Sequence, residues 1–497
     1  MALRGLFSGG YLVAAAAGAL APIGLAPFHF WPATLFSMAL LARLLLTRPE
    51  ASYRLSFCYG AGLFLVGASW VYVSIVSFGS LPASLAALAT LAFALFVALF
   101  FALPFALLGQ LPRTPWSFIA GFSALWLLSE WLRSWLFTGF PWLYAGYSVT
   151  DSWLASYATL GGVYLLGALL AAGAACLAQI DRLNTRQRLA ATLTITTVVL
   201  MALPLDRIEW TAADGEPISI ALLQPDVDQA QKWSRSQRMA ILDALEERSE
   251  PLWGHDLVVW PEAAVPAIAQ SVPTFLARVD RRARASGSAL ITGIPNYQTA
   301  TASYYNSLLG LGAASGLYNK TQLVPFAEYI PLQSLLGPLL AIFELPMESM
   351  AYGDRHQPLL QIGSLALASA ICYEVVYPDL VAKQAGDAGL LLTVSNDAWF
   401  NHTIAPQQHL QMAQLRARES AKPMVRATNN GISALIDRRG KLLKSAPQYR
   451  AATLTGALQP RLGSTPFTRT GSLPMVVLAL LICVILTGQK FANHRKV

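Results

Sequence analysis

Three side chains that together could transfer an acyl group follow strand-like segments in the polar part of the chain. Glu262 closes the segment DLVVWPE, Lys320 closes GLYNK and Cys372 closes LALASAIC. Side chains at strand ends meet at one rim of an α/β fold, where such folds build their sites. An acyl transfer needs a nucleophilic thiol, a base that removes its proton and a cation that holds the oxyanion. These three residue types supply that set.

Cys372 is the expected nucleophile. The other three cysteines, Cys58, Cys176 and Cys483, lie in long apolar runs, so Cys372 has no partner for a disulfide in the polar segment. The apolar run before it predicts a strand and the residues after it a helix, so the thiol would project from a turn. Alternatively, a free cysteine is a small buried hydrophobe. Glu262 and Lys320, each taken alone, are equally compatible with ordinary solvated charges.

The composition predicts an integral membrane protein. The chain has 497 residues, of which 55% are hydrophobic and only 12% charged, and such a chain is too apolar for one soluble globule. The net charge of +8 could indicate a nucleic-acid partner, but the polar segment contains no basic run. We therefore expect no nucleic-acid partner and attribute the basic residues to membrane orientation.

Eight apolar runs come close to the length of about 20 residues that a membrane-spanning helix needs. Seven of them precede Asp206 and one closes the chain, which predicts a bundle of eight transmembrane helices. The runs are residues 6–24, 30–46, 55–77, 81–108, 116–137, 157–179, 189–205 and 473–487.

The lysines and arginines of the short loops predict the orientation of the bundle. With a cytoplasmic N-terminus, every inside loop carries at least one arginine, whereas the outside loops at 25–29, 78–80 and 138–156 carry no lysine or arginine. This bias places both termini in the cytoplasm. It predicts three parts: a seven-helix bundle at 1–205, an extracytoplasmic domain at 206–472, and an eighth helix with a cytoplasmic tail at 473–497.

One charged pair lies inside a predicted span. Glu130 and Arg133 are three residues apart on one helical face, and charges in a bilayer are costly unless they are paired. We expect either a structural ion pair or a pair that holds a lipid headgroup or docks the outer domain.

The outer segment alternates strand-like and helix-like patterns, which predicts an α/β sandwich. We expect a polar linker at 461–472. The predicted strands are 218–224, 256–260, 289–294, 305–311, 365–370, 389–394, 424–428 and 433–436, and the predicted helices are 236–248, 272–285, 378–384 and 406–421.

Three motifs resemble the Glu-Lys-Cys motifs of the nitrilase, or carbon–nitrogen hydrolase, superfamily: WPE at 260–262, YNKTQLVPFAEYIP at 318–331 and AICYE at 370–374. Together with the predicted spans, they make the chain similar to the membrane-embedded branch of that superfamily, the apolipoprotein N-acyltransferases. Further segments match that branch: TGFPWL at 138–143, QPDVDQAQKW at 224–233, SNDAWF at 395–400, QQHLQMAQLRARE at 407–419 and ATNNGISALID at 427–437. Ala327 stands where many members carry glycine.

The resemblance implies a nitrilase-like αββα domain and assigns roles to four residues. Glu262 would be the general base, Lys320 the support of the oxyanion, Cys372 the nucleophile and Glu328 an accessory acid. The family's reaction has two steps: the thiolate takes an acyl chain from a phospholipid, chiefly phosphatidylethanolamine, and the thioester then acylates the α-amine of a lipoprotein's diacylglyceryl-cysteine. The rival function is a membrane-tethered amidase or nitrilase in which water takes the place of the amine.

The remaining expectations concern ligands and location. The resemblance implies a monomeric, multi-pass protein of the bacterial inner membrane with a periplasmic catalytic domain and no cofactor. We expect no metal site, because the six histidines form no HExxH pair and no second thiol is near. An apolar stretch at 331–350 is expected to dip into the membrane interface as a lid, or else to be a buried helix. The candidate substrate-binding residues are Trp233, Asn306, Tyr373, Glu374, Trp399 and Phe400.

Overall fold

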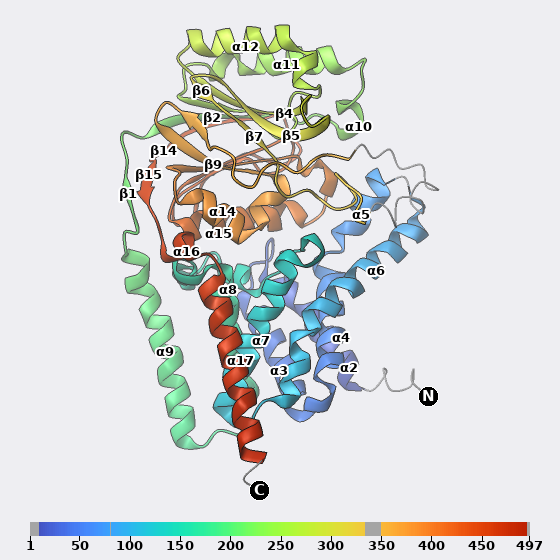
Figure 1. The fold of residues 1–497 in the computed structure, drawn as a ribbon, viewed down its shortest axis with the longest axis vertical. Coiled ribbons are helices and arrows are strands. Elements are labelled where there is room, and N and C mark those ends of the chain that lie inside the picture. Colours follow the sequence, from blue (N-terminus) through green and yellow to red (C-terminus); the bar gives the residue numbers. More distant parts are fainter. Residues whose placement is uncertain (1–8, 80, 333–348, 495–497) are drawn as a thin grey trace. The chain divides into compact units, whose positions relative to one another are not determined.

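A computed structural model describes residues 9–79, 81–332 and 349–494 of the chain (Figure 1). These residues form two compact units. The first contains Met1–Val76, Pro82–Ile208 and Thr470–Val497, and the second contains Ser77–Leu81 and Glu209–Arg469. The predicted lid at 331–350 falls almost entirely on residues 333–348, which lie outside the described residues.

The first unit is helical, with a helix at each of the eight predicted apolar runs. The third run is broken, because α4 ends at Gly67 and α5 begins at Trp70 with a bend of 53° between them. The helices are α2 (Gly9–Leu20), α3 (Trp31–Thr47), α4 (Ser52–Gly67), α5 (Trp70–Phe78), α6 (Ala83–Ala102), α7 (Pro115–Trp135), α8 (Ala158–Ala178), α9 (Thr185–Arg207) and α17 (Leu473–His494).

Four helical segments within the described ranges are long and apolar enough to cross a membrane. They are Ala83–Gln110, Trp153–Ala178, Thr185–Arg207 and Leu473–Ala492, and the bent pair of α4 and α5 would make a fifth. Helices α2 and α3 have only 12 and 17 residues, against the roughly 20 that a full crossing takes. The chain is therefore a membrane protein with at least four helices of spanning length.

Helices α2 and α4 pack at very short range within this unit. A Cβ atom on Gly18 would lie 1.9 Å from the carbonyl oxygen of Tyr59, and one on Gly62 would lie 1.9 Å from that of Ala15. Small residues at such contacts let two helix backbones approach closely, which is how helices associate where lipid removes the hydrophobic driving force.

The second unit is a sandwich of two sheets. One has the strand order β14-β2-β3-β4-β5-β7 and the other β13-β12-β11-β10-β9-β8-β6. The first consists of β2 (Ile218–Gln224), β3 (Leu257–Val259), β4 (Ala289–Gln298), β5 (Ser303–Gly312), β7 (Leu317–Asn319) and β14 (Ala452–Leu458). The second consists of β6 (Ala314–Ser315), β8 (Leu360–Ile362), β9 (Leu365–Ile371), β10 (Leu390–Ser395), β11 (Met424–Thr428), β12 (Ala434–Ile436) and β13 (Leu442–Ser445).

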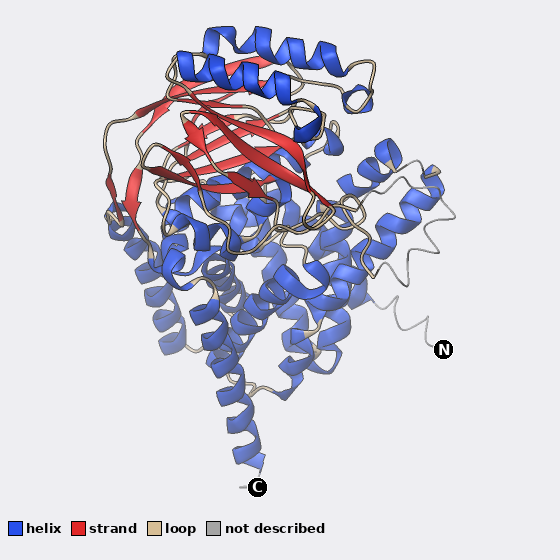
Figure 2. Cartoon of the chain, turned by 45° about the horizontal axis from the view of Figure 1, so that its top comes forward, coloured by secondary structure: helices blue, strands red, loops and turns tan. Residues whose placement is uncertain are grey.

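Helices cover the outer face of each sheet, giving the predicted αββα layers (Figure 2). In β3, Leu257 and Val259 belong to the core between the sheets, whereas Val258 packs toward the helices. This alternation follows from the two-residue period of a strand. The helices of this unit are α10 (Gln229–Lys232), α11 (Arg238–Ser249), α12 (Pro273–Ala285), α14 (Pro378–Ala385), α15 (Ala405–Ser420) and α16 (Pro466–Thr470).

The prediction of a polar linker at 461–472 is wrong. Strand β15 (Arg461–Gly463) pairs antiparallel with β1 (Thr211–Ala213), and α16 begins three residues later. The side chain of Thr465 also donates a hydrogen bond to the carbonyl of Glu419 at 2.7 Å. The segment is ordered because the chain that enters the domain supplies a partner strand, which local polarity does not reveal.

Gly293 of β4 lies directly against the turn that carries Glu262. A Cβ atom there would lie 2.4 Å from the oxygen of Pro261 and 2.7 Å from the Cα of Glu262. We predict that Gly293→Ala destabilises the protein by about 1–3 kcal/mol, a usual cost of overpacking, and slows alkylation of Cys372 by iodoacetamide. Thermal unfolding and mass spectrometry of the full chain in detergent measure the two effects.

Gly386→Ala is the matched control. Its backbone φ is −53° and the nearest atom to an added Cβ would be the Lys383 oxygen at 3.8 Å, so the methyl group is accommodated. Equal behaviour of the two variants would contradict the close contact at Gly293.

Candidate active site

Cys372 stands on a sharp turn at the end of β9. Its φ is +53°, a left-handed conformation that non-glycine residues rarely adopt. The short helix Cys372–Val376 follows at once. Such strained backbone persists only where the surroundings enforce it, and it is common at active sites. The predicted elbow is therefore present.

Glu374 enforces this turn. Its buried carboxylate accepts hydrogen bonds from the backbone N–H groups of Ile371 at 2.7 Å and Thr321 at 2.6 Å, and from the hydroxyl of Tyr318 at 3.0 Å. These contacts tie the elbow to the segment that carries Lys320. This differs from the predicted substrate contact, because internal donors occupy both carboxylate oxygens.

Lys320 follows β7 and lies between two carboxylates. Its Nζ is 2.9 Å from Oε1 of Glu328 and 3.4 Å from Oε1 of Glu262, and the side chain is only 1% exposed. Burial alone would lower the pKa of Lys320, but the Glu328 and Glu262 carboxylates outweigh it and raise the pKa above its usual range. The lysine is therefore a permanent ammonium.

Asn306 on β5 links the same two carboxylates. Its Nδ2 donates to Oε1 of Glu262 at 2.8 Å and to Oε1 of Glu328 at 3.1 Å. The other oxygens are also held, since Oε2 of Glu262 accepts from the backbone N–H of Asn396 at 2.8 Å and Oε2 of Glu328 from that of Val324 at 2.8 Å. Asn306 thus orients the carboxylates of Glu262 and Glu328. Its amide group is engaged by these two residues, whereas the sequence predicted a contact with substrate.

The sulfur of Cys372 lies in the electrostatic field of this group. Burial raises the pKa of the thiol well above its usual value, Glu262 raises it further and Lys320 lowers it. The resting group is a neutral thiol, so a base must take its proton when it attacks. The structure brings Glu262, Lys320, Glu328 and Cys372 together.

A second buried network, with no role predicted from the sequence, supports the elbow from behind. Nε2 of His409 lies 3.1 Å from the carbonyl oxygen of Cys372, and its Nδ1 lies 3.1 Å from Oδ1 of Asp397. Arg426 donates to Oδ2 of Asp397 at 2.9 Å. A carbonyl oxygen only accepts, so Nε2 of His409 carries a hydrogen and fixes the peptide of the nucleophile. Asp397 lies two residues after the end of β10 and within the segment SNDAWF that the sequence analysis singled out.

Charge balance stabilises this network. Burial would raise the pKa of Asp397, but Arg426 and His409 lower it to about 2. Burial and the nearby Arg426 lower the pKa of His409. The carboxylate of Asp397 is therefore ionised at neutral pH.

The predicted aromatic ligands lie in different surroundings. The Trp233 side chain is 48% exposed and that of Trp399 is 37% exposed, whereas Tyr373 is buried. Tyr373 packs edge-to-face on Tyr377 with ring centroids 5.3 Å apart. Phe400 is half-buried and its ring lies 6.2 Å from that of His409. Only the two tryptophans present large apolar areas to the surroundings.

The charged pair of α7 forms two separate sets of contacts and no direct ion pair. Oε1 of Glu130 accepts from the Trp126 indole at 2.9 Å and the Ala145 backbone at 2.7 Å. Arg133 donates to the carbonyl of Trp142 at 3.1 Å, and its guanidinium lies 5.0 Å from the ring centre of Tyr144. The expected ion pair is therefore wrong, since each charge finds polar or aromatic partners that local spacing cannot show.

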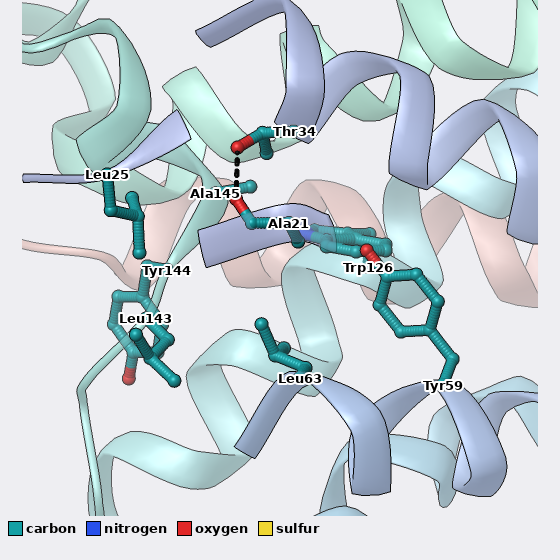
Figure 3. Close-up of a pocket in the computed structure, with 9 residues that line it drawn as sticks. All are labelled: Ala21, Leu25, Thr34, Tyr59, Leu63, Trp126, Leu143, Tyr144 and Ala145. Carbon is teal, nitrogen blue, oxygen red and sulfur yellow. Dashed lines mark hydrogen bonds between the residues drawn. The ribbon is translucent and has the colours of Figure 1, made fainter. Parts of the chain in front are cut away.

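A pocket inside the bundle lies beside Trp126 and Tyr144 (Figure 3). Thr34 donates a hydrogen bond to the carbonyl of Ala21 at 2.8 Å within it. This lining contains no thiol, carboxylate or ammonium group. The lining residues are Ala21, Leu25, Thr34, Tyr59, Leu63, Trp126, Leu143, Tyr144 and Ala145. Among the residues that the structure describes, no three or more His, Cys, Asp and Glu side chains gather as a metal site.

Comparison with known proteins finds two family models and many full-length relatives that match the chain. The family model "Carbon-nitrogen hydrolase" matches residues 219–467, and the model "Apolipoprotein N-acyltransferase N-terminal domain" matches residues 17–176. The apolipoprotein N-acyltransferase of Azotobacter vinelandii is 45% identical over 95% of this chain and 94% of its own length. That of Pseudomonas aeruginosa (strain LESB58) is 42% identical over 98% of each chain. A solved nitrilase-superfamily structure, Nit3 of Saccharomyces cerevisiae, is 18% identical, covers 50% of this chain and 93% of its own, and has a TM-score of 0.39.

The sandwich is thus a carbon–nitrogen hydrolase domain attached to membrane helices. The full-length matches then assign the whole chain, which belongs to the apolipoprotein N-acyltransferase family. It is an acyltransferase by that membership.

We predict that Asp397→Ala strongly destabilises the domain. Arg426 is fully buried, and its Nε and Nη1 have no hydrogen-bond partner among the described residues. Removing the carboxylate leaves an uncompensated buried cation, which costs about 3–5 kcal/mol. Denaturant unfolding in detergent measures the change in the free energy of unfolding.

Asp354→Ala serves as the control, because that side chain is 76% exposed and such substitutions change stability by about 0.5 kcal/mol or less. An Asp397→Ala protein as stable as the wild type would show that the network does not support the elbow.

Proposed function

We propose that the chain moves a fatty acyl group from a phospholipid to the α-amine of the diacylglyceryl-cysteine of an apolipoprotein. The observation that carries this proposal is Lys320, held between Glu262 and Glu328 beside the strained Cys372, in a chain with helices of membrane-spanning length. Phosphatidylethanolamine is the proposed donor, and the proposed active form is a monomer without cofactor.

The first step forms a thioester. Glu262 takes the proton from the Cys372 thiol as sulfur attacks the ester carbonyl of the phospholipid. The Lys320 ammonium stabilises the negative oxygen of the tetrahedral intermediate. When the carbon–oxygen bond breaks, protonated Glu262 returns the proton to the departing lysophospholipid alcohol.

The second step consumes the thioester. The neutral α-amine of the apolipoprotein attacks the carbonyl carbon, Lys320 again stabilises the negative oxygen, and Glu262 takes a proton from the nitrogen. Cys372 then leaves as thiolate and recovers a proton from Glu262. Glu328 and Asn306 hold Lys320 and Glu262 in place through both steps. Asn306 donates hydrogen bonds to Glu262 and Glu328, and Glu328 accepts one from Lys320.

Exposed apolar side chains support a lipid substrate. Phe326 is 56% exposed and Leu332 is 62% exposed, and both are close in sequence to Lys320 and Glu328. Withdrawing an acyl chain from the bilayer costs about 0.8 kcal/mol per CH₂, so a lipid-using site needs apolar surface of this kind. We propose that acyl chains contact Phe326, Leu332, Trp233 and Trp399.

We further propose eight membrane crossings, with divisions at 1–205, 206–472 and 473–497, in a bacterial inner membrane. Both termini would lie in the cytoplasm and the catalytic domain in the periplasm, as the arginine-bearing loops indicate. The two short N-terminal helices, α2 and α3, would cross with their flanking turns.

Cysteine labelling tests this orientation. In a variant with the four native cysteines replaced by alanine, we predict that Thr299→Cys reacts with a membrane-impermeant maleimide in cells whose outer membrane alone is permeable. Thr185→Cys would react only after the inner membrane is opened. Both side chains are exposed in the folded protein. The labelling result therefore depends on whether the maleimide can reach that side of the membrane. Labelling of Thr185→Cys in the closed cells would contradict the proposed topology.

The function itself is tested with a phospholipid that carries a labelled acyl chain. We predict that purified protein acquires a hydroxylamine-labile label on Cys372, because a thioester forms before the acceptor arrives. Cys372→Ala should reduce the label more than about a hundredfold, as expected for loss of a nucleophile. The control replaces Cys58, Cys176 and Cys483 with alanine and should label normally.

The rival function predicts a different outcome. A membrane-tethered amidase or nitrilase would release ammonia from small amides or nitriles and take no label from phospholipid. That result, or unchanged lipoprotein N-termini in cells depleted of the protein, would refute the proposed acyl transfer.

A further inference from the structure

A second lysine is buried at the active site, and neither the motifs nor the proposed mechanism assigns it a role. Lys232 ends the short helix α10, and its side chain is only 2% exposed. Its Nζ donates to the backbone carbonyl oxygen of Glu262 at 3.1 Å. This places an ammonium beside the general base.

Lys232 differs from Lys320 in its counter-ions. Lys320 has carboxylates at 2.9 Å and 3.4 Å, whereas no carboxylate oxygen among the described residues lies within 4.0 Å of Nζ of Lys232. Among the described residues, the Glu262 carbonyl is the single hydrogen-bond acceptor of the Lys232 ammonium. An ammonium has three N–H donors. A buried cation without a paired anion is unfavourable, so the site is prepared for a negative charge.

The charged groups near Lys232 indicate which negative charge the ammonium would stabilise. Burial lowers the pKa of Lys232 to about 8, while negative charge on Glu262 and on Cys372 opposes that shift. The attraction is mutual, so an ammonium at Lys232 also favours the thiolate form of Cys372. At neutral pH most of the lysine remains charged.

We propose that Lys232 supplies a second positive charge at the active site, which stabilises the thiolate of Cys372 as its proton moves to Glu262. This rests on the proposed function, in which Cys372 is the nucleophile. In that step the S–H bond breaks, an O–H bond forms on Glu262, and the negative charge passes from the carboxylate to sulfur. Lys232 therefore has an anion nearby both before and after the transfer.

The other charges around the sulfur show why one ammonium is insufficient. Glu262, Asp397 and Glu328 all disfavour the thiolate, and Lys320 opposes them. Lys320 already pairs with two carboxylates. Their negative charge partly cancels its positive electrostatic potential at the sulfur of Cys372. Lys232 adds positive charge from a different element, the helix α10.

Alkylation of Cys372 by iodoacetamide tests this inference without any lipid. The reagent is uncharged, so its rate reports thiolate formation and not attraction of the reagent. The full chain in detergent, with Cys58, Cys176 and Cys483 replaced by alanine, is followed by mass spectrometry from pH 6 to pH 9. Lys232→Gln removes the charge but keeps a donor for the Glu262 carbonyl, and Lys232→Arg keeps the charge.

We expect Lys232→Gln to lower the alkylation rate at pH 7 at least tenfold. Lys232→Arg should recover much of the rate. The matched control is Lys422→Gln, because Lys422 is also buried and donates to backbone carbonyls, those of Ala385 and Ala388. It should leave the alkylation profile unchanged, since the nearby charge that acts on it is Asp387 and not Cys372.

A wild-type alkylation profile for Lys232→Gln would overturn the inference. So would an unchanged profile combined with a raised KM for phospholipid, which would make Lys232 a ligand of the headgroup phosphate. If Lys232→Gln does not fold, Lys232→Met provides the same comparison of rates. Failure of the wild type to take acyl label would refute the proposed function, yet leave the alkylation result interpretable.

Discussion

The buried ammonium of Lys320 constrains the rest of the domain. A cation that is 1% exposed is several kcal/mol unfavourable unless opposite charges and hydrogen bonds compensate it. The compensation comes from Glu262, which follows β3, and Glu328, in the loop after β7, with Asn306 of β5 between them. The sandwich must therefore bring these strand ends together. The same contacts place the proposed base and the proposed oxyanion ligand beside Cys372.

The elbow of Cys372 is held from two sides. Glu374 ties it to the backbone at Thr321 on one side, and His409 holds the carbonyl of Cys372 on the other. A residue at φ +53° needs such support, because left-handed backbone is unfavourable for cysteine. Fixing the peptide in advance lets the sulfur meet a carbonyl carbon without rearrangement, which is worth a large part of an acyl-transfer barrier.

Sequence patterns predicted eight of the strands and placed Glu262, Lys320 and Cys372 after strand ends, because both depend on local information. Strands β2 and β11 have the predicted bounds, and Cys372 follows its strand as expected. The patterns missed β14 and β15, which pair with strands far away in the chain. They also missed the contacts of His409 with Cys372 and of Arg426 with Asp397, which join residues 37 and 29 positions apart. The proposed role of Lys232 depends on its burial and on the charges around it, and neither can be read from spacing.

We propose that Lys320 acts as one unit with the carboxylate of Glu328. A double-mutant cycle on the rate of Cys372 acylation tests it directly, with Lys320→Met, Glu328→Gln and the combined variant. Residues that act as a unit are strongly non-additive. We expect the double variant to be no slower than Lys320→Met alone, because Glu328 has no further role once the ammonium is gone. Multiplied losses in the double variant would mean that the two residues act independently and would contradict the account.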